Sequence, residues 1–153
     1  MQKHPKFIAD VNLGRLAKWL RLLGYDTLFH KNISIYTLTR LANSEKRIFL
    51  TRSVKNYNKK IFDEKILLKN DLVFEQLDEL RSIIRYDEAF AFTRCSACNS
   101  LLVEVDKPRI KSLVPSYVYE TNDLFKLCRS CGKIYWKGTH KDEIEGRLLK
   151  LSP

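Results

Sequence analysis

Short apolar runs alternate with longer stretches of mixed polarity along the first half of the chain. Four of these runs predict buried strands, at residues 7–9, 27–29, 48–51 and 66–68. Between the first two, leucines recur at helical spacing, which predicts a helix that stops at Gly24. The same spacing predicts a helix over about 35–42 with Ser34 as its N-cap, and a last helix from Leu77 to about Tyr86.

Strands that alternate with helices indicate βαβ units, and therefore an α/β fold in which helices flank a parallel sheet. Ligands of such sheets bind beyond the carboxyl ends of the strands. Asp10 directly follows the first predicted strand, and Arg52 and Ser53 follow the third. The pattern therefore predicts a binding edge that contains these three residues.

Four cysteines in two CxxC pairs indicate a second, smaller module. Cys95 and Cys98 are separated from Cys128 and Cys131 by 29 residues, and Gly132 supplies the permissive backbone of a tight turn. Apolar stretches between and after the pairs predict the short strands of a zinc ribbon, at residues 101–103, 117–119 and 134–136.

Four thiolates complete the tetrahedral coordination of a structural zinc site and leave no open position for catalysis. The predicted metal is therefore a structural Zn²⁺. Free or disulfide-linked cysteines are the alternative, and His140 is a further candidate ligand that is more often a surface residue. The chain is expected to divide into an α/β domain over residues 1–90 and a zinc-ribbon module over residues 91–153.

The formal net charge of +10 indicates the kind of partner that the protein binds. The bias is sharpest over residues 46–60, which include six basic and no acidic side chains. This balance favours a polyanion, and RNA is the expected partner; the alternative is a basic surface kept for solubility. The residues expected to contact RNA are Arg15, Arg52, Lys55, Lys59 and Lys60.

Nothing in the sequence predicts a membrane protein. No apolar run approaches the length of a membrane span, and polar residues at once interrupt the apolar stretch that follows the basic N-terminus, so no signal peptide is predicted. Paired CxxC motifs are typical of metal ligands in reducing compartments. We therefore expect a cytoplasmic protein.

Several blocks together resemble a known family. Its long N-terminal block corresponds to residues 7–27, and a shorter one to residues 48–52. The first CxxC pair, residues 114–121 and residues 128–140 complete the match. The sequence resembles the Mut-seven C-terminal RNase domain family, which joins a PIN-like nuclease domain to a zinc ribbon. The resemblance covers nearly the whole chain.

The resemblance implies a metal-dependent ribonuclease in which acidic residues at the strand ends hold Mg²⁺ or Mn²⁺. Asp10 occupies the first acidic position of the family. The acid usual near the start of the second helix is replaced by Ser34 or a neighbouring residue, and the acid usual after Leu-Thr-Arg is replaced by Ser53. Asp71, after the fourth predicted strand, is the candidate second carboxylate, and Ser53 is a weak or water-mediated ligand.

Two functions from different classes follow. One is a PIN-like ribonuclease with an incomplete acidic metal site, and the other is an inactive PIN-like protein that binds RNA or a ribonucleoprotein. The missing acids favour binding, whereas the family chemistry favours cleavage. Asp10 could also serve only as an acid near the start of the following helix. A DNA-binding zinc protein is a third, weaker interpretation.

Overall fold

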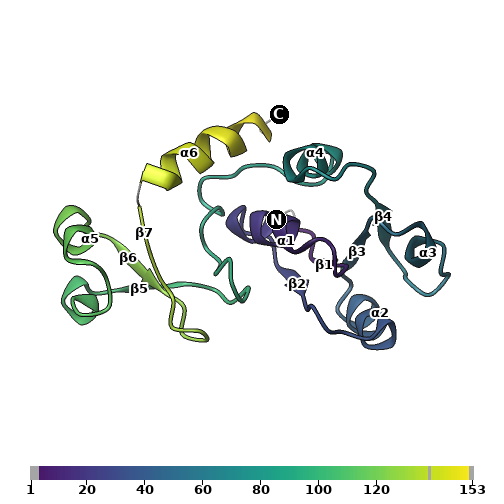
Figure 1. The fold of residues 1–153 in the computed structure, drawn as a ribbon, viewed down its shortest axis with the longest axis horizontal. Helices are drawn as coiled ribbons and strands as arrows, with labels where there is room; N and C mark the ends of the chain where they lie inside the picture. The colour runs from purple at the N-terminus through teal and green to yellow at the C-terminus, as the bar shows by residue number, and fades with distance from the viewer. Residues whose placement is uncertain (1–3, 138, 152–153) are drawn as a thin grey trace.

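The computed structural model describes residues 4–137 and 139–151 (Figure 1). The first half is built as strands that alternate with helices. Its elements are β1 (Phe7–Ala9), α1 (Gly14–Leu22), β2 (Thr27–Phe29), α2 (Ile35–Ser44), β3 (Ile48–Thr51), α3 (Val54–Tyr57), β4 (Lys65–Leu67) and α4 (Val73–Glu79). The four strands form one parallel sheet in the order β2-β1-β3-β4, which confirms the predicted α/β fold.

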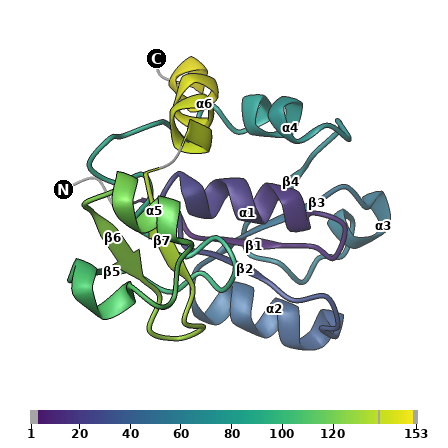
Figure 2. The same cartoon turned by 60° about the vertical axis from the view of Figure 1, so that its left-hand side comes forward.

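Both faces of the sheet are covered, as a parallel sheet requires. Successive side chains of a strand point to opposite faces. Phe7 and Ala9 of β1 pack with the leucines of α1 and α4, whereas Ile8 and Phe49 pack with Leu38 of α2. Figure 2 shows α1 and α4 on one side of the sheet and α2 on the other. The strands are thus buried on both faces, which explains their apolar runs.

Local signals set several element ends as predicted. The Ser34 side chain accepts a hydrogen bond from the Thr37 N–H and caps α2. Gly24 follows α1 with a φ of +100°, and a Cβ there would lie 2.3 Å from the Phe90 carbonyl oxygen. A left-handed conformation and a close backbone approach therefore both require glycine at this position.

The last helix of the first half differs from its prediction. It spans Val73–Glu79 instead of extending from Leu77 to about Tyr86. Beyond it the chain continues in turns, because the Ile83 N–H donates to the Leu80 carbonyl oxygen three residues earlier. Leu80 and Ile84 are nevertheless buried in the main core. Apolar spacing identified the buried residues correctly but not the backbone that carries them.

The second half forms a small antiparallel sheet in the order β5-β6-β7, from β5 (Val103–Val105), β6 (Phe125–Leu127) and β7 (Ile134–Trp136). β7 matches its prediction, β5 begins two residues later than predicted, and β6 was not predicted. The strand predicted at 117–119 is wrong, because these residues lie in α5 (Ser116–Thr121), which follows the short helix η1 (Lys107–Ile110). Pro115 directly precedes α5, and Val118 alone of its residues is buried.

The C-terminal helix α6 (Thr139–Leu148), followed by η2 (Leu149–Leu151), returns to the α/β domain. Leu148 is fully buried in the main core, and the Arg147 guanidinium lies 5.0 Å from the Phe74 ring centroid. Tyr86 donates a hydrogen bond to Glu145. The predicted division at residue 90 lies between the two sheets. It assigns α6 to the ribbon module, although α6 packs on the α/β domain. None of the described helices is long and apolar enough to cross a bilayer.

Candidate functional site

Asp10 lies where the connections of the parallel sheet diverge. From β1 the chain passes through α1 to β2 on one side, and α2 then carries it back to β3 on the other side of β1. Such a switch point opens a crevice beyond the carboxyl ends of the two central strands. Asp10 follows β1 at this point, and its N–H donates to the Leu50 carbonyl oxygen of β3 at 2.9 Å.

Neutral donors surround the Asp10 carboxylate, which is buried with 7% of the residue exposed. Its Oδ2 accepts from Thr51 Oγ1 at 2.7 Å and from Asn56 Nδ2 at 2.9 Å, and its Oδ1 accepts from the Val11 N–H at 2.8 Å. The Ser53 N–H donates to Thr51 Oγ1, and Ser53 Oγ accepts from the Asn56 N–H. The network therefore stabilises a carboxylate at this edge without a second charge in direct contact.

Replacing Thr51 with valine should test this network. Thr51 is fully buried, and the change removes the hydroxyl that donates to Asp10 and accepts from Ser53. We expect the free energy of unfolding to fall by about 2 kcal/mol, because hydrogen bonds to charged groups contribute about 1.5–3 kcal/mol. Chemical denaturation measures the change.

The matched control is Thr39→Val, because the Thr39 hydroxyl donates only within its own helix, to the Ile35 carbonyl oxygen. This variant should lose much less stability. Equal stability of the Thr51→Val variant and the natural chain would contradict a structural role for the network.

Besides Asp10, the candidate ligands of a catalytic metal are Ser53 and Asp71. Ser53 caps α3, and its Oγ is engaged with Asn56. Asp71 is exposed in the loop between β4 and α4. Among the residues that the structure describes, the four cysteines are the group in which three or more His, Cys, Asp or Glu ligand atoms come together. The catalytic roles of Asp10, Asp71 and Ser53 stay predictions.

Three of the five predicted RNA-contacting residues lie at this same edge. Arg15 is exposed in the first turn of α1, and Arg52 and Lys55 are exposed at and after the end of β3. Lys60 is exposed and Lys59 is half-buried. Because the carboxyl ends of parallel strands meet at one edge, Arg15, Arg52 and Lys55 lie on the side of the sheet that holds Asp10. Lys59 and Lys60 follow α3 on the way to the start of β4, where Lys65 donates to the Lys59 carbonyl oxygen.

The four cysteines come together as the spacing predicted. Their Sγ atoms all lie within 4.8 Å of one another, with Cys95 and Cys131 at 3.7 Å and Cys98 and Cys128 at 3.3 Å. Gly132 has a φ of +80°, the left-handed conformation that the turn after the second pair requires. The cluster could bind a metal such as zinc, whose structural sites use four thiolates. The His140 side chain lies outside the described residues.

The groups around the sulfurs favour a thiolate at Cys98 and disfavour one at Cys131. Tyr135 Oη lies 3.0 Å from Cys95 Sγ and accepts from the Ser96 N–H, so its own proton is available to the sulfur. The Ser100 N–H and hydroxyl lower the pKa of Cys98 to about 6. At Cys131 the Lys133 N–H lowers the pKa, but burial and the other three sulfurs outweigh it and raise the pKa to about 11. A metal binds the thiolate and not the thiol, so the donors at Cys95 and Cys98 favour the binding of a cation. Hydrogen bonds to ligand atoms also fix the orientation of metal ligands.

The first CxxC turn is docked onto the α/β domain by buried polar contacts. Arg21 of α1 donates to the carbonyl oxygens of Ser96 and Ala97 and also to that of Thr27. Asn99, with a φ of 74°, accepts from the Thr27 N–H through Oδ1. The backbone of this cysteine-bearing turn is therefore part of the domain interface.

Asp26 extends this contact to the amino ends of the strands. Asn99 Nδ2 and the Arg47 guanidinium donate to Asp26 Oδ1 at 2.7 and 2.8 Å. Burial raises the pKa of Asp26, but the hydrogen bonds from Arg47 and Asn99 outweigh this effect and hold it below its usual value. Asp26 therefore lies at the edge opposite Asp10 and serves the domain interface.

Sequence reasoning missed three residues of these sites. Asn56 carried no signal beyond its place in a polar segment, and Tyr135 was assigned only to a strand. Helical spacing places Arg21 on the face opposite the leucines at positions 13, 16, 20 and 23, which predicts an exposed side chain, although it is buried with 6% exposed. Each acts through a contact between segments far apart in sequence, which spacing along one segment does not reveal.

The fold and these sites define an α/β protein with a single carboxylate at the switch point of its sheet and a joined four-cysteine ribbon. The chain belongs to the Mut7-C RNAse domain family, whose model matches residues 5–148. The match spans both sheets and confirms the resemblance seen in the sequence. Neither the curated proteins nor the solved structures contain a match to this chain.

Proposed function

We propose that the chain binds RNA across the carboxyl edge of its parallel sheet, and that Zn²⁺ at the four cysteines holds the ribbon in its folded form. The observation that carries this proposal is the composition of the edge. Exposed basic residues lie on the side of the sheet that holds one carboxylate, and that carboxylate is already hydrogen-bonded to three donors. We place the protein in the cytoplasm, where thiols stay reduced and available to metal.

Physical reasons favour binding over cleavage. A divalent cation that acts on phosphate generally needs several oxygen ligands, and protein carboxylates are the preferred ones. Here Oδ2 of Asp10 accepts two hydrogen bonds, and the surrounding basic residues repel a second cation. The donor set therefore does not fit a complete Mg²⁺ or Mn²⁺ site. It fits a surface that attracts phosphates through Arg and Lys.

Charge reversal at Arg52 and Lys55 should weaken RNA binding for unrelated sequences about equally, because phosphate contacts carry little sequence information. The slope of log affinity against log salt should become shallower by about 0.7 for each phosphate of a single strand that the variant no longer neutralises. Fluorescence anisotropy of labelled single-stranded RNAs, at salt concentrations from about 50 to 200 mM, measures both effects.

The matched control is Lys111→Glu, which reverses an exposed charge at the end of η1 in the ribbon. It should change the affinity much less than the double reversal. Binding at this edge would be contradicted if the affinity did not depend on salt concentration, or if the double charge reversal left the affinity unchanged.

Metal-dependent ribonuclease activity is the second candidate function. The family and the position of Asp10 at the switch point favour it. Asp10 would be the principal ligand, with Asp71 and Ser53 as the other candidates, and a bound metal would supply an activated water and charge neutralisation at the phosphate. Incubation of mixed structured and single-stranded RNAs with Mg²⁺, Mn²⁺ or EDTA distinguishes the two functions. We expect weak cleavage or none.

A further inference from the structure

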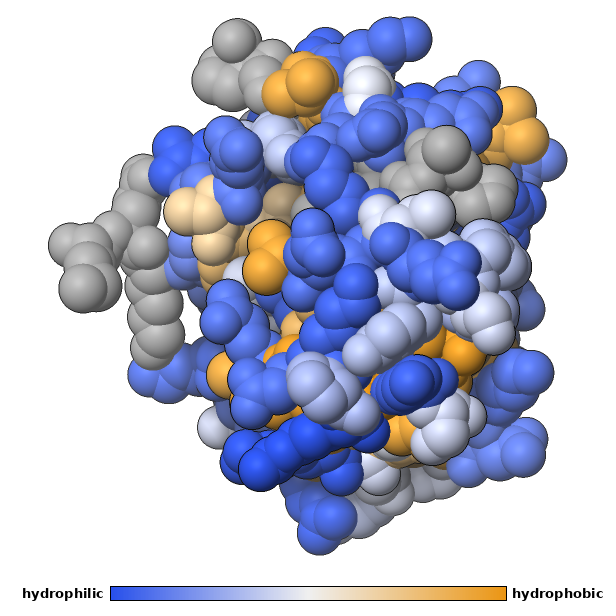
Figure 3. All heavy atoms as spheres, turned by 90° about the vertical axis from the view of Figure 1, so that its left-hand side faces the viewer, coloured by the Kyte–Doolittle hydropathy of each residue, from blue (hydrophilic) through white to orange (hydrophobic). Residues whose placement is uncertain are grey.

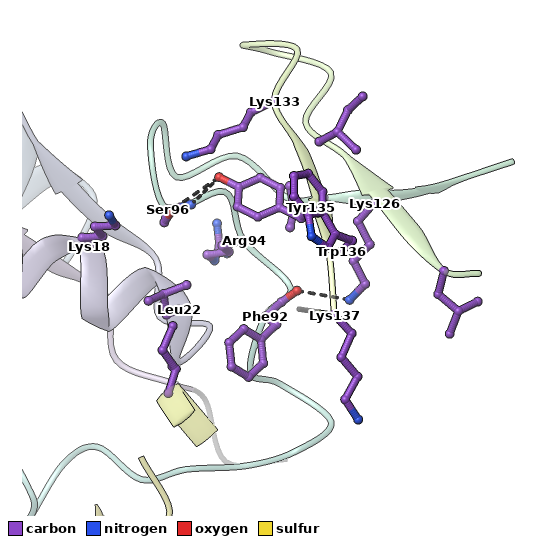
Figure 4. Close-up of a pocket in the computed structure, with 14 residues that line it drawn as sticks. Lys18, Leu22, Phe92, Arg94, Ser96, Lys126, Lys133, Tyr135, Trp136 and Lys137 are labelled. Carbon is purple, nitrogen blue, oxygen red and sulfur yellow. Dashed lines mark hydrogen bonds between the residues drawn. The ribbon is translucent and has the colours of Figure 1, made fainter. Parts of the chain in front are cut away.

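A pocket of about 500 Å³ lies between the α/β domain and the ribbon (Figure 4). Lys18 and Leu22 of α1 line one side, Trp136 and its neighbours in β7 line the opposite side, and Ile144 of α6 also contributes. Small-molecule sites in proteins commonly have volumes of about 300–1,000 Å³. The pocket is therefore large enough for a nucleotide and is built from both halves of the chain.

The lining of this pocket combines aromatic and basic side chains. Its aromatic members are Phe92, Tyr135 and Trp136. Its basic members are Lys18, Arg94, Lys126, Lys133 and Lys137, and no acidic residue lines it. Figure 4 shows Tyr135 and Trp136 next to one another, with lysines on several sides of the space. Aromatic faces beside cations are the combination by which proteins bind single-stranded nucleic acid.

The charge in this pocket is not neutralised by carboxylates of the described residues. Arg94 donates to the carbonyl oxygens of Gly24 and Asn99, and Lys126 donates to that of Phe92. The ion pairs found within the described part of the chain include no residue that lines the pocket. The site therefore has a positive potential that favours an anion such as phosphate.

Trp136 is available to a ligand, with 36% of its surface exposed. Leu124 at the same pocket is still more exposed. On the ribbon side of the molecule, hydrophilic side chains predominate and apolar atoms show only between them (Figure 3). The exposed indole of Trp136 therefore lies in a pocket that lysines also line.

The pocket is separate from the Asp10 edge. Leu22 ends α1, whereas Asp10 and Arg15 lie at its beginning. A helix of this length spans about 13 Å at about 1.5 Å per residue. One RNA strand could contact both places, but one nucleotide could not.

We propose that this pocket binds an unpaired nucleotide of single-stranded RNA. The base stacks on Trp136, and Lys126, Lys133 or Lys137 contacts an adjoining phosphate. This inference rests on the proposed RNA binding and adds to it a second contact, formed by the zinc ribbon. It assigns the ribbon a direct role in holding RNA beyond its structural one.

Tryptophan fluorescence tests this directly, because the chain has two tryptophans, Trp19 and Trp136. The Trp19→Phe variant reports on Trp136 alone, and the Trp136→Phe variant reports on Trp19, which packs against Phe74. A short single-stranded oligoadenylate should quench the first variant and leave the second nearly unchanged. A double-stranded RNA of matching length should quench neither, since its bases are not available for stacking.

Affinity gives a second readout. Trp136→Ala should weaken oligoadenylate binding by about 5- to 150-fold, because stacking of one base on an aromatic side chain contributes about 1–3 kcal/mol. Trp136→Phe should retain part of the affinity. Tyr117→Ala is the matched control, since Tyr117 is an aromatic residue of α5 that is 69% exposed and does not line the pocket. Zinc content and circular dichroism verify that the variants are folded.

The outcomes separate the two proposals. If the natural chain binds no RNA, the proposed function and the pocket assignment both fail. If it binds RNA but Trp136 is not quenched and Trp136→Ala binds as well as Tyr117→Ala, the pocket assignment alone is overturned. In that case the aromatic and basic lining serves another partner, such as a protein segment.

Discussion

Replacing Cys128 with serine should abolish zinc binding and unfold the ribbon. Cys128 is fully buried, and its Sγ lies 3.3 Å from that of Cys98 at the centre of the cluster. Structural zinc contributes about 10–16 kcal/mol of apparent binding free energy in zinc-finger peptides, so the small three-stranded sheet should not persist without it. Metal analysis should give about one zinc per chain for the natural protein and almost none for the variant.

Loss of zinc should also destabilise the part of the α/β domain that contacts the ribbon. The first CxxC turn accepts hydrogen bonds from Arg21, and the Asn99 side chain beside it accepts one from the Thr27 N–H. A disordered turn removes these contacts. We expect hydrogen exchange to accelerate across β5 to β7 first and then at β2. Arg129→Ala is the matched control, because Arg129 is an exposed residue within the second CxxC pair. Full zinc content in the Cys128→Ser variant, or two disulfides in the natural protein, would contradict the zinc assignment.

Restoring the acidic residues of the family should increase metal-dependent cleavage. The combined Ser34→Asp and Ser53→Asp variant should cleave RNA about 100-fold faster with Mn²⁺ than the natural chain, the size of effect that one positioned catalytic group often contributes. Both serines are N-caps whose side chains accept a backbone N–H hydrogen bond. Aspartate serves equally well at an N-cap, so the variant should fold with little loss of stability.

Asp10→Asn provides the control for this restoration. Added to the double variant it should abolish the gained cleavage, whereas RNA binding should stay the same or improve because one negative charge is removed. Ile33→Asp or Ile35→Asp replaces Ser34→Asp if the missing acid belongs to a neighbouring position. Strong cleavage by a preparation that carries Asp10→Asn, free of contaminating nuclease, would contradict the assignment of Asp10 as the metal ligand.

The two proposed contacts would together form one RNA-binding surface. The carboxyl edge of the sheet presents cations beside a carboxylate that neutral donors already satisfy. The pocket at the other end of α1 presents aromatic rings beside cations. The first kind of contact binds any phosphate backbone, whereas the second requires an unpaired base. Together they favour single-stranded RNA over duplex.

The strand prediction succeeded where the signal was local. Four parallel strands and the two helices that follow β1 and β2 were evident from apolar runs, because strands buried on both faces have few polar residues. The ribbon was harder to predict, since its strands are short and only partly buried. Tyr117–Tyr119 has the composition of a strand, but the segment after Pro115 forms a helix that buries Val118 against Ile110 and Phe125. Tertiary packing overrode the local preference.

The sequence by itself determined the α/β class, the cluster of four cysteines that could bind a metal, the family and the scarcity of acids at the strand ends. These depend on residue identity, periodicity and spacing, which are properties of the chain. Only the tertiary structure decided that Thr51 and Asn56 donate hydrogen bonds to the Asp10 carboxylate. It also decided that Arg21 is buried against the first CxxC turn, and that Trp136 faces α1 across a basic pocket. Each of these contacts joins segments distant in sequence, and their geometry is set by how the sheet, the ribbon and α6 pack together.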